Sequence, residues 1–280
     1  MKFYHIILSL IVIGFTSCNN KTIKKNIEID NYSKLDSILE IYRSKDEYII
    51  APIFIENITK SIRDLSTAER KKIFIETLLP NIILSNDSIL LIRSKIIELS
   101  ENNHLNKNDD KWLNGICKTY RCKENDFENL LLKIDIIPPS MAIAQSIVES
   151  GWGTSRFAIE GNSIFGEHHS NGATGKHVKA DSSDVKMKVF ASIYDAVSSY
   201  SLNINRHRAY KQFREKRKQQ RNKNIELNSL ELVDALTSYS ELGNEYTKYI
   251  KRFITYNKLT SYDKLKLGNS KTEYFVSIKK

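Results

Sequence analysis

The stretch SMAIAQSIVESGWGTSRFAIEGNSIFG, residues 140–166, decides the fold. It predicts a helix that follows two prolines and ends at Gly151, because glycine readily adopts the left-handed conformation that terminates helices. Ser140 is expected to be the N-cap, since its hydroxyl can accept from a free backbone N–H group of the first turn. The last turn carries one acid, Glu149, next to glycine and aromatic residues. The apolar positions that recur at helical spacing are Met141, Ala144, Ile147 and Val148.

The position of Glu149 favours a protonated carboxyl group. The C-terminal end of a helix carries the negative end of its dipole, which disfavours a charged acid there. Aromatic neighbours would also exclude water and raise the pKa of the carboxyl group. A carboxyl group that keeps its proton at neutral pH can serve as a general acid. A surface glutamate ending an ordinary helix is the simpler interpretation of an isolated residue, and the flanking glycines and aromatics argue against it.

The motif AQSIVESGWGTSRFA, followed by GNSIFGE, resembles the glucosaminidase domain of glycoside hydrolase family 73, and especially its Bax-like branch. The blocks VFASIYDAV, NINRHRAY and YSELGNEYTKYI follow in the family's order, and the likeness covers roughly residues 45–258. The resemblance implies a mainly α, lysozyme-like domain with a small β-hairpin lobe, preceded by a helical N-terminal region. It also implies peptidoglycan as the substrate and Glu149 as the catalytic acid.

The resemblance implies further site residues. Many family members are thought to place a second acid on the β-lobe, where this chain has Lys186 and Lys188, so Asp184 and Glu167 become the candidates. Without a second acid, the N-acetyl group of the sugar could act as the nucleophile. Tyr239 holds the position from which a lysozyme-like tyrosine reaches the acid, although simple packing is equally possible. The residues expected to bind substrate are Trp152, Asn162, Phe165, Gly166 and Tyr200, the last expected mainly in the core.

Residues 1–17 predict a lipoprotein signal peptide. The apolar run Ile6–Phe15 is too short to span a bilayer, and small residues precede Cys18 as in a lipobox. Cys18 would then be lipidated and would anchor the protein to a membrane of the cell envelope, outside the cytoplasm. Ordinary signal cleavage beside an incidental cysteine is the alternative. The polar residues 19–33 predict a tether, and no later run reads as a membrane span.

The rest of the chain divides by pattern. Residues 34–135 predict helices throughout, with a capping box formed by Ser66 and Glu69 and an interruption at Pro80. The catalytic domain is expected over residues 136–258, with a β-hairpin that turns at residues 181–184. Residues 259–280 predict a polar extension without an assigned role. The nine Lys and Arg residues between 206 and 223 fit either a solvated helix face or a site for anionic wall or lipid.

Composition limits the partners. The formal net charge of +10 favours anionic wall polymers or lipid headgroups, and no motif for nucleic acid is present. We expect no cofactor and no metal, because the adjacent His168 and His169 diverge and no acid pair completes a site. Cys117 and Cys122 could pair or remain free thiols. We expect a monomer.

The predicted activity is that of an endo-β-N-acetylglucosaminidase that cleaves peptidoglycan glycan strands. A lytic transglycosylase shares the need for one acid. An amidase would cut the peptide stem instead, and a non-catalytic wall-binding lipoprotein would keep the cleft without turnover.

Overall fold

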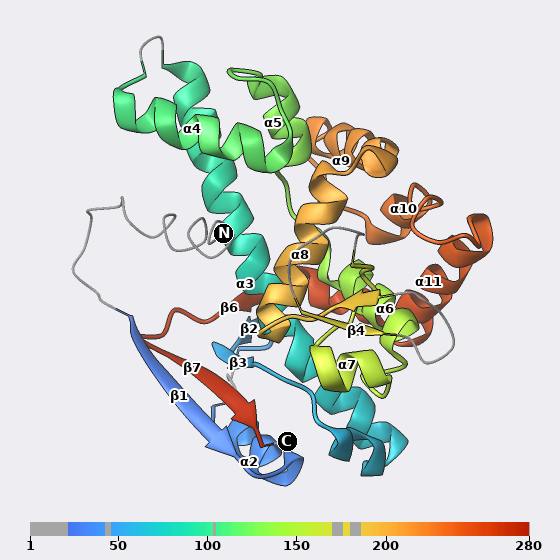
Figure 1. Ribbon diagram of the computed structural model, residues 1–280. Helices are drawn as coiled ribbons and strands as arrows, with labels where there is room; N and C mark the ends of the chain where they lie inside the picture. Colours follow the sequence, from blue (N-terminus) through green and yellow to red (C-terminus); the bar gives the residue numbers. More distant parts are fainter. Residues whose placement is uncertain (1–21, 43–45, 103–104, 170–175, 180–185, 280) are drawn as a thin grey trace.

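The computed structural model describes residues 22–42, 46–102, 105–169, 176–179 and 186–279. Helices dominate the architecture, as expected (Figure 1). The helices are α2 (Tyr32–Ile41), α3 (Thr67–Glu101), α4 (Lys107–Tyr120), α5 (Phe127–Lys133), α6 (Pro139–Ser150), α7 (Arg156–Gly161), α8 (Ile193–Arg206), α9 (Lys211–Asn222), α10 (Ser229–Val233) and α11 (Asn244–Tyr256). The strands are β1 (Ile23–Ile29), β2 (Ile49–Ile50), β3 (Ile53–Ile55), β4 (His177–Lys179), β5 (Lys186–Lys188), β6 (Lys266–Leu267) and β7 (Thr272–Ile278).

Helix α6 is mostly buried and packs against α3, α10 and α11. It ends at Gly151, whose φ of 58° confirms the predicted left-handed cap. The predicted N-cap role of Ser140 is wrong, because the helix begins at Pro139 and Ser140 lies inside its first turn. The cap comes instead from the far C-terminal segment. The Asp263 carboxylate accepts from both the backbone N–H and the hydroxyl of Ser140, each at 2.7 Å, and an anion at this end of a helix is favourable.

Helix α3 is the long central helix of Figure 1. Its capping box between Ser66 and Glu69 is present as predicted. The predicted interruption at Pro80 is wrong, since the helix runs through that residue. A mid-helix proline costs about 3 kcal/mol, and burial of the surrounding turn offsets it. The Asn81 amide also ties this turn to Thr77 O at 2.8 Å and to Ile55 O at 3.2 Å.

By length and composition alone α3 also qualifies as a membrane span, although no span was expected from the sequence after residue 17. Its best 18-residue window has a mean hydropathy of 1.3, and 61% of that window is buried inside the protein. Since helices α6 and α8 pack against it, α3 is the core helix of the fold.

The two ends of the described chain meet in a parallel sheet of order β1-β7-β3. Figure 1 shows β1 and β7 side by side, in register from Ile23 opposite Thr272 to Ile29 opposite Ile278. The expected tether is therefore wrong for residues 23–29, and residues 272–278 of the expected extension form strand β7 of this sheet. Strands β2 and β3 likewise lie in a region predicted to be helical throughout. Parallel pairing between distant segments leaves no signal in local helical periodicity.

One core cluster extends from Ile29 to Ile278 and crosses the boundary expected near residue 135. A second cluster joins the C-terminal half of α3 to α4 and α5. It contains Cys117 and is packed by Cys122, and both are free thiols.

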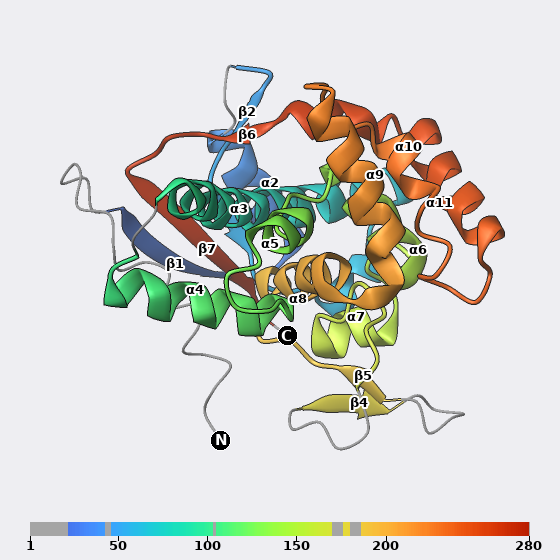
Figure 2. The ribbon, with the colours of Figure 1, turned by 90° about the horizontal axis from the view of Figure 1, so that it is seen from above.

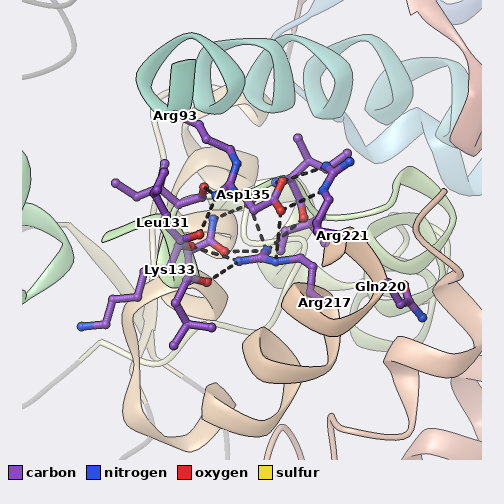
Figure 3. A network of polar contacts seen from close by, with 12 residues as sticks. Arg93, Leu131, Lys133, Asp135, Arg217, Gln220 and Arg221 are labelled. Atoms are coloured by element: carbon purple, nitrogen blue, oxygen red, sulfur yellow. Dashed lines mark hydrogen bonds and ion pairs between the residues drawn. The ribbon is translucent and has the colours of Figure 1, made fainter. Parts of the chain in front are cut away.

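The basic segment 206–223 is partly internal, so it is more than a solvated face. Arg214 and Arg217 are buried, and Arg221 donates two hydrogen bonds to Asp135 at 2.9 and 3.0 Å (Figure 3). Asp135, Arg217 and Arg221 line a cavity of about 350 Å³ between α3, α5 and α9. The network joins α9 to the segment that leads from α5 into α6, and so fixes where α6 begins.

Candidate active site

Glu149 lies half-buried on the last turn of α6. The Tyr246 hydroxyl, on α11, donates to Glu149 Oε1 at 3.1 Å. Burial raises the pKa of the Glu149 carboxyl group, and the hydrogen bond from Tyr246 opposes that rise in part. The direction confirms the expectation of a raised pKa, and it favours a carboxyl group that retains its proton.

Gly166 gives the second oxygen of Glu149 its space. Its φ is +65°, a left-handed value that side chains rarely adopt, and a Cβ at this position would lie 2.8 Å from Glu149 Oε2. The Oε2 atom thus lies directly against backbone, while Oε1 is held by tyrosine. A glycine here is required by both backbone conformation and close approach.

Replacement Gly166→Ala is therefore expected to push the Glu149 carboxyl group out of position. We expect at least a tenfold loss of kcat/KM, because small misplacements of a reacting group can cost up to about 100-fold. The left-handed φ adds a penalty on the order of 1 kcal/mol to folding. Gly243→Ala is the matched control, since Gly243 also has a positive φ, of 52°, and nothing within 4 Å of its Cβ position. Turnover on a peptidoglycan suspension and urea unfolding measure the two effects separately, and equal activity losses in both variants would contradict the steric explanation.

Aromatic side chains form the floor beside Glu149. Phe165 stacks on Tyr200 with ring centroids 4.0 Å apart, and Tyr239 stacks on Tyr246 at 5.4 Å. The Tyr239 hydroxyl donates to the backbone carbonyl of Phe165 at 3.1 Å. The tyrosine that hydrogen-bonds the acid is therefore Tyr246, and the role expected for Tyr239 is wrong in this respect. The spacing of Tyr246 on α11 indicates only ordinary helix packing, so the sequence alone does not reveal this contact.

The residues expected to bind sugar take different positions. Tyr200 and Phe165 are only 1% and 3% exposed, so they support the site from beneath and cannot present a ring to a sugar in this structure. Trp152 is half-buried and packs edge-on against Phe74 at 5.9 Å. Asn162 is buried and donates to the Phe190 carbonyl at 3.3 Å, while its Oδ1 finds no partner in the described part of the chain.

Glu167 is a buried, ion-paired acid next to Gly166. Its Oε2 accepts from the Lys188 ammonium group at 2.6 Å and from the Ser199 hydroxyl at 2.9 Å, and its side chain is 8% exposed. Burial raises the pKa of Tyr210, and the charges of Glu167 and Glu149 raise it further, while a hydrogen bond with Asn203 lowers it. Both carboxyl groups therefore act on one tyrosine, and the fold brings them to the same region.

The predicted β-hairpin is confirmed by the antiparallel pair β4–β5, which projects from the helical body in Figure 2. Its turn, with Asp184, lies outside the described residues, as does Cys18. His168 is exposed, and the ring of His169 lies 5.1 Å from that of His177. Within the ranges that the structure describes, no three His, Cys, Asp or Glu residues are grouped as metal ligands would be.

Comparison with known proteins identifies the family. A family model described as mannosyl-glycoprotein endo-beta-N-acetylglucosaminidase, named Glucosaminidase, matches residues 124–280, more than half of the chain. The chain belongs to the glucosaminidase family. "Protein bax" from Escherichia coli (strain K12) is 33% identical over 195 residues, which cover 66% of this chain and 69% of that protein. The resemblance carried by the motif around Glu149 is thereby confirmed, and the family is one of glycoside hydrolases with a mainly α, lysozyme-like fold.

Solved structures show more distant similarity. The catalytic domain of the autolysin Auto from Listeria monocytogenes is 17% identical with a TM-score of 0.39, over 71% of this chain and 90% of that domain. A truncated glycoside hydrolase domain of Salmonella typhimurium FlgJ is 18% identical with a TM-score of 0.33, over 44% and 84%.

Proposed function

We propose that this protein is a peptidoglycan hydrolase, an endo-β-N-acetylglucosaminidase with Glu149 as its general acid. The observation that carries the proposal is the environment of Glu149. A family motif presents this carboxyl group half-buried, with a raised pKa, between a tyrosine donor and a glycine that lies against its second oxygen. Such a group can protonate the glycosidic oxygen as the bond to the leaving sugar breaks.

The second role in hydrolysis is stabilising the positive charge that develops on the sugar, or activating water. Glu167 is one candidate, because it follows Gly166 in the chain and its Oε2 is held in place by the Lys188 ammonium group and the Ser199 hydroxyl. Asp184 on the hairpin turn remains the other candidate. If neither acts, the acetamido group of an N-acetylated sugar would attack from within the substrate.

One feature supports binding of N-acetylglucosamine, whereas Asn162, which was also expected to bind substrate, is buried. The half-buried ring of Trp152 follows the helix that carries Glu149 and could stack on a sugar.

For localisation, we propose that Cys18 is lipidated and that the monomeric protein acts in the cell envelope from a membrane anchor.

Digestion of purified peptidoglycan followed by mass spectrometry tests the activity. The expected products are glycan fragments with new reducing ends on N-acetylglucosamine. Anhydro sugars without a reducing end would identify a lytic transglycosylase, and released peptides would identify an amidase. Binding to the wall with no released product would show a non-catalytic lipoprotein and would overturn the proposed activity.

A further inference from the structure

A chain of hydrogen bonds leads from the protein core to Glu149. The Tyr200 hydroxyl on α8 donates to Gln145 Oε1 at 2.6 Å, and the Gln145 amide donates to the Tyr246 hydroxyl at 3.0 Å. The Tyr246 hydroxyl then donates to Glu149 Oε1 at 3.1 Å. Gln145 is fully buried, Tyr200 is 1% exposed and Tyr246 is 2% exposed, so water is excluded from the first two bonds, while the third reaches the half-buried Glu149.

The direction of the chain follows from the number of protons available. A tyrosine hydroxyl has one hydrogen to donate, and a glutamine amide has donors only on its nitrogen. Since Tyr200 donates to Oε1 of Gln145, the Nε2 of that amide faces Tyr246. Tyr246 therefore accepts from Gln145 and gives its own hydrogen to Glu149. With the amide turned over, its oxygen would take the Tyr246 hydrogen, and a Glu149 carboxylate would lose its donor.

We infer that Tyr200 and Gln145 are positioning residues that commit Tyr246 to donate to Oε1 of Glu149. The oxygen held in this way is an acceptor in both protonation states of the acid. The transferable proton is therefore carried by Oε2, the oxygen that lies against Gly166. When that proton leaves, the carboxylate that remains already has a donor in place, and successive bonds in a buried chain strengthen one another.

The inference deepens the proposed function, and rests on it only in naming Glu149 as the acid of the reaction. The effect on the carboxyl group itself is independent of turnover. A donor to the charged form lowers the pKa of an acid, so weakening any bond of the chain should raise the pKa of Glu149 above its already elevated value.

The direct test is a ¹³C NMR titration of the full-length protein labelled at glutamate carboxyl carbons, with the Glu149 signal assigned by its loss in Glu149→Gln. Tyr246→Phe should raise the pKa of Glu149 by about one pH unit. Gln145→Met and Tyr200→Phe leave the Tyr246 hydroxyl in place, and each should shift the pKa upward by a smaller, measurable amount. If the protein is active, the alkaline limb of kcat/KM against pH should move in the same order.

The matched control is Tyr210→Phe, which removes another buried tyrosine hydroxyl near Glu149 but breaks none of the three hydrogen bonds of the chain. Its ring centroid lies 6.0 Å from that of Tyr239, in the same aromatic cluster. Its Glu149 pKa should stay near the wild-type value. The inference is overturned if folded Gln145→Met and Tyr200→Phe proteins both keep the wild-type pKa, or if Tyr210→Phe shifts it as much as they do. Should Gln145→Met fail to fold, Tyr200→Phe decides, since it removes one oxygen atom only. Absence of turnover with shifted pKa values would reject the proposed function and retain the hydrogen-bond chain.

Discussion

Replacement Glu149→Gln is expected to reduce kcat/KM on peptidoglycan by about 10²–10⁴-fold, the range typical for loss of a general acid. The amide keeps the size of the side chain and can still accept from Tyr246 through its oxygen. It has no acidic proton to transfer to the leaving sugar, so the chemical step should fail while the fold remains. Release of reducing ends from a wall suspension measures the loss, and the midpoint of urea unfolding checks that the fold is intact.

The control for this variant is Glu160→Gln. Glu160 lies on the neighbouring helix α7, where its exposed carboxylate pairs with Arg156 at 3.2 Å. An exposed ion pair contributes little to stability, and this one has no place in the proposed chemistry, so activity should stay near that of the wild type. Full activity in a folded Glu149→Gln protein would remove Glu149 from the acid role. A large loss in Glu160→Gln would show that the assay responds to general damage.

The structure around Glu149 could be predicted from the sequence wherever a feature depends on residues that lie close together in the chain. The helix stop at Gly151, the capping box of α3 and the hairpin β4–β5 all depend on residues a few positions apart, and each was predicted. The pKa direction of Glu149 followed from its aromatic surroundings. Local patterns therefore predicted the helix that carries Glu149 and the elements on either side of it.

Contacts between distant segments were not predictable. Tyr246 lies 97 positions from Glu149, and its helical spacing indicates only a core residue. Asp263 caps α6 across 123 positions, so the serine at the start of that helix was assigned a role that another residue performs. The pairing of β1 with β7 joins the two ends of the described chain. In each case the partner is selected by tertiary packing, which a single sequence does not encode in any local period.

Replacement Asp135→Asn is expected to lower the free energy of unfolding by about 3–5 kcal/mol, the usual cost of breaking a buried ion pair from one side. Arg217 is 1% exposed, and its guanidinium group donates to the backbone carbonyls of Asp135 and Lys133, both at 3.0 Å (Figure 3). The nearest carboxylate oxygen, Oδ2 of Asp135, is 4.0 Å from its Nε. Without that charge, the buried guanidinium group would have carbonyl dipoles alone, and Arg221 would lose its two-point partner.

Glu128→Gln is the matched control, because Glu128 pairs with Lys218 of the same helix α9 at 2.8 Å and its side chain is 85% exposed. Its removal should leave the urea midpoint near the wild-type value, since water screens such a pair. If Asp135→Asn and Glu128→Gln lower the free energy of unfolding equally, stability depends on the total charge around α9 and not on the burial of the ion pair. If neither variant lowers it, the carbonyl oxygens alone are sufficient to stabilise the buried guanidinium group of Arg217.

The dependence of this effect on pH has a definite sign. Burial raises the pKa of Asp135, but the hydrogen bonds from Arg221 and the charges of Arg217, Arg221 and Arg93 lower it by more, so the folded pKa lies below the ordinary value. A carboxyl group of this kind contributes stability above its unfolded pKa, and the contribution is lost as the pH falls through the folded pKa. The free energy of unfolding of the wild type should therefore exceed that of Asp135→Asn by the full amount at neutral pH. The difference between the two proteins should narrow as the pH falls. Urea unfolding of both proteins from neutral pH down to about pH 3 measures the gap, and a gap that widened toward acid would place the stabilising charge elsewhere.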